Sequence, residues 1–257
     1  MMKQKNAPIA VFDSGVGGIS VLRELVALMP NENYIYLGDS ANAPYGTRPV
    51  EEIRALTLAN VDILLEQGAK ALVVACNTAT SAAVRILRGM YPELPIVGIE
   101  PALKPAALHH PGGRIAVLAT NMTLRQEKFA ALLEHYRSQA GIIPVPASEL
   151  VEYVERGELD SPALFSLIKH ILGRHLDAPA DAIVLGCTHF PFVRPVIERA
   201  APHTVIYDGG NGTAREARRQ LYAMELTNPS SEPGSIEIQN SSGDPDKIML
   251  CYQLLDA

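Results

Sequence analysis

Short, uninterrupted apolar runs recur along the chain, and each is followed by a polar turn and then a helical pattern. The clearest runs are 8–12, 71–75, 114–119 and 182–185, and none of them alternates between apolar and polar residues. A strand of this kind is typical of a parallel sheet that is covered by helices on both faces. The sequence therefore predicts an α/β fold of open sheets with mostly parallel strands.

The arrangement of strand and polar turn occurs twice. The run that ends before Thr120 echoes the run that ends before Asp13, and the interval to the next cysteine is 63 residues from Asp13 and 67 residues from Thr120. These near-equal intervals indicate a duplicated half. We expect two pseudo-symmetric α/β domains with an active site in the cleft between them; their predicted limits are 1–98 with 207–257, and 99–206.

Two cysteines hold equivalent places in these halves. Cys76 follows the run 71–75, Cys187 follows the run 182–185, and a helical pattern begins after each. A thiolate near the positive end of a helix is stabilised by the helix dipole and by free N–H groups. A lone cysteine is more often a small buried apolar residue, which is how we interpret Cys251 on the apolar face of the last predicted helix. The repetition favours a functional interpretation of the other two.

A pair of opposed thiols suits inversion at a carbon atom. One thiolate can remove a proton from one face of the substrate while the other thiol supplies a proton to the opposite face. Asp13 and His189 are the candidates for exchanging protons with Cys76 and Cys187 respectively. The alternatives are a capping role for Asp13 in a tight turn and a helix-cap or core role for His189.

Short polar side chains cluster at the same predicted strand ends. With helix N-terminal N–H groups they could hold a carboxylate and an ammonium group, although each alone is more typical of a helix cap. They are Ser14, Asn77, Thr78, Thr120, Thr123 and Thr188. The loop 41–47 contains turn residues and could close over a ligand.

Charge and cysteine usage limit the partners. The formal charge of −6 argues against binding to nucleic acid or to an anionic membrane. No apolar run approaches 18 residues, and the N-terminus lacks an apolar signal region, so we expect a cytoplasmic protein. The three cysteines show no disulfide framework, and no CxxC or HExxH spacing indicates a metal site. The predicted partner is a small molecule.

The combined motifs resemble those of the glutamate racemases, cofactor-independent enzymes of the aspartate/glutamate racemase superfamily, over essentially the whole chain. The motifs are Phe12-Asp13-Ser14-Gly-Val-Gly-Gly, Leu-Gly-Asp39-Ser, Pro44-Tyr45-Gly46, Ala-Cys76-Asn77-Thr78-Ala, Leu-Gly-Cys187-Thr188-His189-Phe-Pro and Gly-Asp244-Pro. Leu-Ala-Thr120-Asn-Met-Thr123 departs mildly from the Gly-Thr-x-x-Thr that is usual in the family.

The resemblance implies racemisation of glutamate, with Cys76 and Cys187 as the two proton carriers and Cys76 acting on the D-enantiomer. It also implies that Asp39 and an acid near residue 155 assist the thiols; Val154-Glu155-Arg-Gly157 fits the family pattern best, with Glu152 one helical turn away. The residues expected around glutamate are Asp13, Ser14, Pro44, Tyr45, Gly46, Asn77, Thr78, Thr120, Thr123, Thr188 and His189.

By the same resemblance, the product D-glutamate would feed bacterial peptidoglycan, and a homodimer is expected because relatives are commonly dimers. Some relatives need a cell-wall precursor as activator and have a longer N-terminus; few residues precede the first strand here, so we expect no such dependence. An aspartate or hydantoin racemase would share both thiols, and a non-catalytic amino-acid binding module is the alternative outside the enzymes.

Overall fold

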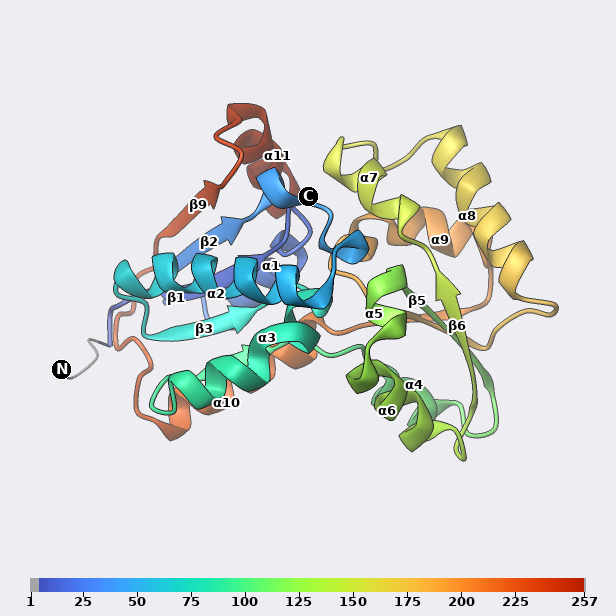
Figure 1. Ribbon diagram of the computed structural model, residues 1–257, viewed down its shortest axis with the longest axis horizontal. Coiled ribbons are helices and arrows are strands. Elements are labelled where there is room, and N and C mark those ends of the chain that lie inside the picture. Colours follow the sequence, from blue (N-terminus) through green and yellow to red (C-terminus); the bar gives the residue numbers. More distant parts are fainter. Residues whose placement is uncertain (1–4, 257) are drawn as a thin grey trace. The chain divides into compact units, whose positions relative to one another are not determined.

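The computed structural model describes residues 5–256, which form two compact units (Figure 1). Unit 1 contains the chain up to Ile99 and again from Gly210, and unit 2 is Glu100–Gly209. Each unit has one sheet with helices on both faces, and every strand pairing in the described residues is parallel. The predicted α/β class is confirmed.

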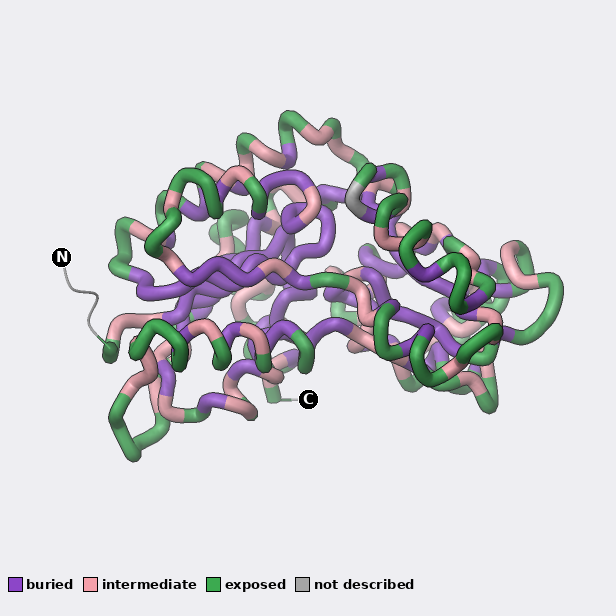
Figure 2. The backbone as a smooth tube through the Cα atoms, turned by 90° about the horizontal axis from the view of Figure 1, so that it is seen from below, coloured by how far each residue is buried: buried purple, intermediate pink, exposed green. Residues whose placement is uncertain are grey.

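The sheet of unit 1 has five strands in the order β4-β3-β1-β2-β9. The strands are β1 (Ile9–Asp13), β2 (Tyr34–Gly38), β3 (Ala71–Val74), β4 (Ile96–Gly98) and β9 (Ile236–Asn240). The central strands β1, β2 and β3 are buried along their whole length, as the purple tube of Figure 2 shows. Because β9 pairs with β2, the C-terminal segment lies in the sheet of unit 1.

Five helices cover the sheet of unit 1. They are α1 (Ile19–Leu28), α2 (Val50–Glu66), α3 (Asn77–Met90), α10 (Gly210–Ala223) and α11 (Pro245–Asp256). Helix α1 packs against α10 and α11, whereas α2 packs against α3 and, like α3, contacts the sheet. Cys251 on α11 is fully buried, which agrees with its interpretation as a packing residue.

The sheet of unit 2 has the order β6-β5-β7-β8. Its strands are β5 (Arg114–Ala119), β6 (Gly141–Pro146), β7 (Ala182–Leu185) and β8 (Val205–Asp208). In both sheets the first strand lies between the second and third, and the fourth follows the third. The first four strands of each unit therefore share one topology, and β9 is the strand that only unit 1 adds.

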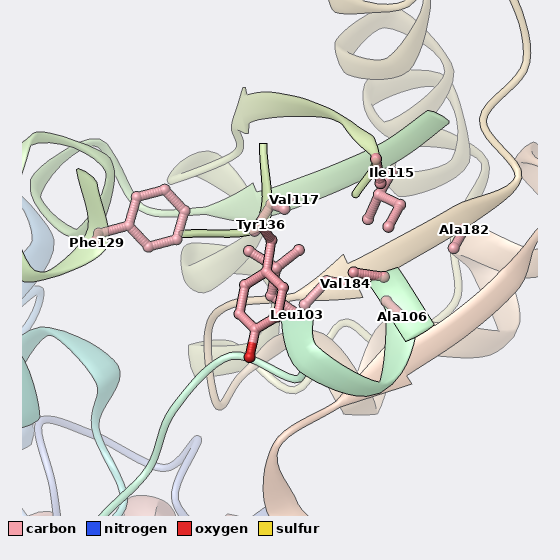
Figure 3. Close-up of a cluster of buried hydrophobic side chains, with 10 residues drawn as sticks. Leu103, Ala106, Ile115, Val117, Phe129, Tyr136, Ala182 and Val184 are labelled. Atoms are coloured by element: carbon pink, nitrogen blue, oxygen red, sulfur yellow. The ribbon is translucent and has the colours of Figure 1, made fainter. Parts of the chain in front are cut away.

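Six helices of the described residues belong to unit 2. They are α4 (Leu103–His109), α5 (Asn121–Arg125), α6 (Glu127–Tyr136), α7 (Glu149–Glu155), α8 (Pro162–His175) and α9 (Arg194–Ala200). Two of them, α4 and α6, enclose a core against β5 and β7. Figure 3 shows Leu103 of α4 and Tyr136 of α6 packed against Val117 of β5 and Val184 of β7. Ser161 caps α8 through an Oγ that accepts from the Leu164 N–H at 3.1 Å, and Pro162 follows it at the start of the helix.

One expected helix is divided. The pattern 123–136 predicted a single helix, but Gln126 has extended backbone (φ −76°, ψ 140°) and separates α5 from α6. The Gln126 carbonyl accepts from the N–H groups of Phe129 and Ala130, so it starts the second helix. The loop after β2 also contains two 3₁₀ turns, Ser40–Asn42 and Tyr45–Thr47. The turn residues of this loop predicted an irregular loop and not these turns.

Among residues 5–256, no helix combines the length and the apolar character needed to cross a membrane.

Candidate active site

The carboxyl edge of the unit 1 sheet gathers three of the predicted residues. Asp13 ends β1, Asp39 follows β2, and Cys76 follows β3 after a single alanine. Parallel pairing places Phe12 opposite Leu37 on one side and opposite Val74 on the other. Side chains that follow the three strands therefore emerge at the same edge, which is where open α/β sheets bind ligands. We call Asp13, Ser14, Tyr45, Cys76 and Asn77 the Cys76 cluster.

Cys76 is the N-cap residue of α3. Its Sγ accepts from the Ala79 N–H at 3.5 Å and lies 3.3 Å from Ser14 Oγ. The side chain is 5% exposed. The Ala79 N–H, the Ser14 hydroxyl and the positive end of α3 therefore lie next to the sulfur, and such groups can stabilise a thiolate.

Asp13 is fully buried at the end of β1. Its Oδ2 accepts from the Gly15 N–H at 3.0 Å, so the carboxylate also fixes the glycine-rich turn. A Cβ atom at Gly18 would lie only 2.5 Å from Asp13 Cβ. Glycine is needed at position 18 because the start of α1 passes directly over the aspartate.

The loop 41–47 presents Tyr45 within the Cys76 cluster. Tyr45 and Gly46 are buried, whereas Pro44, which follows a cis peptide bond, is exposed. The Tyr45 hydroxyl donates to Asp39 Oδ2 at 2.6 Å. Burial and then this hydrogen bond raise the pKa of Tyr45, and the negative charges of Cys76 and Asp13 add to the rise. The phenol therefore stays protonated and acts as a donor.

Asn77 and Thr78 form the first turn of α3, and both are buried. The Oδ1 atom of Asn77 is buried and has no hydrogen-bond partner in the protein. A buried acceptor without a donor is costly, and such atoms in native proteins call for an explanation. A ligand that brings an N–H or ammonium group to this oxygen would remove the cost.

The carboxyl edge of the unit 2 sheet carries the second thiol. Cys187 follows β7 after Gly186, and it is partly exposed, unlike Cys76. A Cβ at Gly186 would lie 2.9 Å from the Leu118 carbonyl oxygen, so glycine lets the chain leave β7 close against β5. We call Thr120, Thr123, Glu155, Cys187, Thr188 and His189 the Cys187 cluster.

His189 connects Cys187 to an acid. Its Nδ1 lies 3.7 Å from Cys187 Sγ, and its Nε2 lies 2.8 Å from Glu155 Oε1. Burial would lower the pKa of His189, but hydrogen bonds to Cys187 and Glu155 outweigh it, so the pKa lies well above the usual 6.5. His189 is therefore held as an imidazolium beside the sulfur.

Glu155 and Glu152 differ in their surroundings. Glu155 lies at the end of α7 with a side chain that is 13% exposed, in contact with His189. The Glu152 side chain is 71% exposed and lies 3.9 Å from an Arg156 nitrogen. Of the two acids that the sequence left open, Glu155 is the one in the Cys187 cluster.

Three threonines complete the Cys187 cluster. Thr120 caps α5, where its Oγ1 accepts from the Thr123 N–H at 3.3 Å and lies 3.0 Å from Thr123 Oγ1. Thr188, which follows Cys187 in the sequence, is also buried. Thr120 lies two residues beyond Leu118, which pairs with Leu185 of β7, and Ser14 likewise lies two residues beyond Phe12, which pairs with Val74 of β3. Thr120 therefore takes the place in unit 2 that Ser14 has in unit 1.

Sequence reasoning missed the residues that hold Asp39. Its carboxylate accepts from Asn60 on α2 and from Ser241 after β9. Neither residue belongs to a recognisable motif, and both come from segments distant in the chain. Within residues 5–256, no group of three or more His, Cys, Asp or Glu side chains has a metal-binding arrangement.

Known proteins that are similar in sequence and in fold define the class of this protein. A family model described as Asp/Glu/Hydantoin racemase matches residues 9–217. A glutamate racemase from Clostridium botulinum (strain Alaska E43) is 46% identical over 257 residues, which cover all of both chains.

Two solved structures are also similar. The glutamate racemase of Thermus thermophilus in complex with β-chloro-D-alanine has a TM-score of 0.82 at 34% identity, covering 99% of this chain and 95% of that one. The Escherichia coli glutamate racemase in complex with L-glutamate and the activator UDP-MurNAc-Ala has a TM-score of 0.82 at 30% identity, with coverages of 96% and 94%.

The chain therefore belongs to the Asp/Glu/Hydantoin racemase family. Its fold of two parallel α/β sheets is that of the solved glutamate racemases. Within the family, its full-length relatives place it among the glutamate racemases, which are isomerases.

Proposed function

We propose that this racemase inverts glutamate by a two-thiol mechanism in which Cys76 and Cys187 act on opposite faces of the α-carbon. The observation that carries the proposal is the equivalence of the two thiols. Each follows the third strand of a sheet with the same topology, and each has its own set of polar neighbours.

The proton balance of the reaction is simple. One cysteine, as thiolate, takes the α-proton and becomes a thiol, which leaves a carbanion at the α-carbon. The other cysteine, as thiol, gives its proton to the opposite face and becomes a thiolate. The enzyme then returns to its first state by proton exchange with neighbouring groups, or it serves the reverse direction. Following the family resemblance, we assign Cys76 to D-glutamate and Cys187 to L-glutamate.

The two clusters support their thiols in different ways. Ser14 and the Ala79 N–H stabilise the Cys76 thiolate, and Asp13 is our candidate for proton exchange with it. His189, whose raised pKa results from its hydrogen bonds to Cys187 and Glu155, stabilises the Cys187 thiolate and can return a proton to it.

Glutamate binding uses the short polar groups of both clusters. We assign the Asn77 Oδ1 to the substrate ammonium group, because this buried oxygen has no partner in the protein. The Gly46 backbone is assigned to a carboxylate, and Tyr45, whose hydroxyl donates to Asp39, lines the site with Pro44 shaping the loop. The remaining contacts come from Asp13, Ser14, Thr78, Thr120, Thr123, Thr188 and His189.

We further propose that the enzyme supplies D-glutamate for peptidoglycan, acts in the cytoplasm, uses no cofactor and forms a homodimer. These points follow from the family resemblance. Sedimentation velocity tests the homodimer directly, and a monomer at working concentration would contradict it.

The decisive experiment uses the single variants Cys76→Ser and Cys187→Ser. Each is expected to lose racemisation of both glutamate enantiomers, measured by optical rotation. Each should still eliminate chloride from one enantiomer of a β-chloro amino acid, with opposite preferences in the two variants, because elimination needs only one base. Wild-type racemisation by either variant would overturn the two-thiol scheme.

Exchange of the α-hydrogen separates this function from the alternatives. Wild-type protein in D₂O should incorporate deuterium into glutamate. Binding without exchange would indicate a non-catalytic amino-acid binding protein. Exchange with aspartate but not with glutamate would assign the substrate to a different branch of the family.

A further inference from the structure

The buried carboxylate of Asp39 is surrounded by side-chain donors of unit 1. Oδ1 accepts from Ser241 Oγ at 2.5 Å and from Asn42 Nδ2 at 3.0 Å. Oδ2 accepts from Tyr45 Oη at 2.6 Å and from Asn60 Nδ2 at 3.0 Å. A carboxylate has about four lone-pair sites, so these four donors take up its capacity. Asp39 therefore fixes the positions of the four side chains that donate to it.

Asp39 connects the tail of the chain with the loop that carries Tyr45. Tyr45 is 1% exposed, and the charges of Cys76 and Asp13 contribute to its raised pKa, so its ring lies within the Cys76 cluster. Ser241, by contrast, comes from the segment after β9, about two hundred residues further along the chain. The Asp39 carboxylate therefore accepts hydrogen bonds from both segments and links them.

Ser241 is fixed by more than its contact with Asp39. Its backbone N–H donates to the Gly38 carbonyl at 3.0 Å, and its Oγ accepts from the Ala41 N–H at 3.1 Å. Next to it, Asn240 Nδ2 donates to Ser40 Oγ at 2.9 Å. The hydroxyl thus accepts from the start of the loop and donates to Asp39 at the same time.

The Gly243-Asp244-Pro245 motif shapes the turn that delivers Ser241. Asn240 Oδ1 accepts from the Ser242 N–H at 3.0 Å, and Ser242 Oγ accepts from the Asp244 N–H at 3.2 Å. Asp244 Oδ1 then accepts from the Asp246 N–H at 2.9 Å in the first turn of α11. A chain of local hydrogen bonds therefore runs from β9 into the helix and fixes the turn between them.

We propose that Ser241 is a positioning residue which, through Asp39, holds Tyr45 and Gly46 in the conformation that binds glutamate. The inference rests on the proposed function, because it takes the loop 41–47 as part of the glutamate site. It gives β9, the strand that only unit 1 adds, and the turn that follows it a role in substrate binding. Asp39 then acts on the loop and not as a proton carrier for Cys76.

The test compares Ser241→Ala with Ser231→Ala, an identical change at an exposed serine of the same tail. In Ser241→Ala the loop loses one of its anchors, so we expect KM for both glutamate enantiomers to rise about tenfold, with kcat changed by less than about threefold. Ser241→Thr keeps the hydroxyl, and its added methyl group can face solvent because Ser241 is exposed, so KM should return to within about twofold of wild type.

A double variant tests the path through Asp39. Tyr45→Phe removes the other hydroxyl on this carboxylate and should also raise KM. If both hydroxyls act through Asp39, the KM increase in Tyr45→Phe/Ser241→Ala is smaller than the product of the two single increases. Multiplying increases would overturn the inference. Thermal unfolding of every variant shows that the comparison is made on folded protein.

Two other results would also overturn the inference. One is a KM for Ser241→Ala equal to that of Ser231→Ala. The other is a fall in kcat at constant KM, with a shifted pH profile, in Ser241→Ala or Asp39→Asn; that result would make Asp39 part of the proton path. The proposed function is tested separately, because wild type and Ser231→Ala must exchange the α-hydrogen of glutamate whatever Ser241 does.

Discussion

His189 Nε2 lies 2.8 Å from Glu155 Oε1, and this pair links the end of α7 to the residue two positions after Cys187. The side chain of His189 is 3% exposed and that of Glu155 is 13% exposed. A hydrogen-bonded, partly desolvated pair of this kind stabilises the imidazolium, which is the form that stabilises a neighbouring thiolate.

Glu155→Gln should therefore lower kcat. The amide removes the negative charge that supports protonated His189, so the positive charge beside the Cys187 sulfur is weakened. We expect kcat to fall about tenfold or more, with the larger effect in the direction that starts from L-glutamate. Initial rates from each pure enantiomer and the primary isotope effect with α-deuterated substrate measure this.

The matched control is Glu152→Gln on the same helix. Glu152 is exposed and lies 3.9 Å from an Arg156 nitrogen, a surface pair of small energetic value. This variant should keep kcat within about twofold of wild type. Equal effects in the two variants would mean that the loss of Glu155 acts through the general charge of α7.

The stability of the protein should depend on the protonation of His189. Its folded-state pKa is raised above the unfolded value of about 6.5, so its contribution is fully present below that value and is lost as pH rises through the folded-state pKa. We expect the free energy of unfolding to fall as the pH rises above the unfolded-state pKa of about 6.5, and to fall less in His189→Asn. Urea unfolding across this range measures both slopes; identical slopes would show that other groups cause the dependence.

Much of the fold was predictable because it depends on local patterns. The apolar runs at β1, β3, β5 and β7 and the repeated interval to each cysteine predicted two parallel sheets, and the structure confirms them. Gln126 could not be identified as a helix boundary, since it carries no proline or glycine signal and its extended backbone is selected by the packing around it.

The candidate site was predictable where its residues end strands. Cys76, Cys187 and Asp13 directly follow apolar runs, so topology brings them to a sheet edge. Asn60 and Ser241 could not be found in this way, because they reach Asp39 from the middle of a helix and from the C-terminal segment. The choice between Glu152 and Glu155 needed the rotation of α7, which places only Glu155 against His189.

Asn77→Ala should weaken glutamate binding without destabilising the free protein. The Asn77 Oδ1 is buried and has no partner, so its removal loses little in the absence of substrate and costs one charge-assisted hydrogen bond in its presence. We expect KM to rise about tenfold and the free energy of unfolding to change by less than about 1 kcal/mol. A large loss of stability with unchanged KM would show a structural role for the amide.

Gly18→Ala should disturb Asp13. The backbone of Gly18 is helical (φ −63°, ψ −12°), so any residue can adopt it, but an added Cβ would lie 2.5 Å from Asp13 Cβ. We expect a destabilisation of about 1–3 kcal/mol from overpacking, together with a lower kcat. Gly89→Ala is the control: it also places alanine in a helix, nothing lies within 4 Å of its Cβ, and it should be stabilising by up to about 1 kcal/mol. Urea unfolding and racemisation rates of both variants check this.

Lys70→Met should strongly destabilise unit 1. The Lys70 side chain is fully buried, and its Nζ donates to Glu32 Oε2 at 2.5 Å and to the Lys5 carbonyl oxygen. The other carboxylate oxygen, Glu32 Oε1, accepts from the Asn228 N–H at 2.8 Å. Removing the ammonium leaves a buried carboxylate unpaired, which costs about 3–5 kcal/mol in comparable pairs. Lys70→Met/Glu32→Gln removes that charge and should recover part of the loss in urea unfolding. Equal stability of the single and double variants would show that the cost arises from the shape of the lysine and not from the unpaired carboxylate.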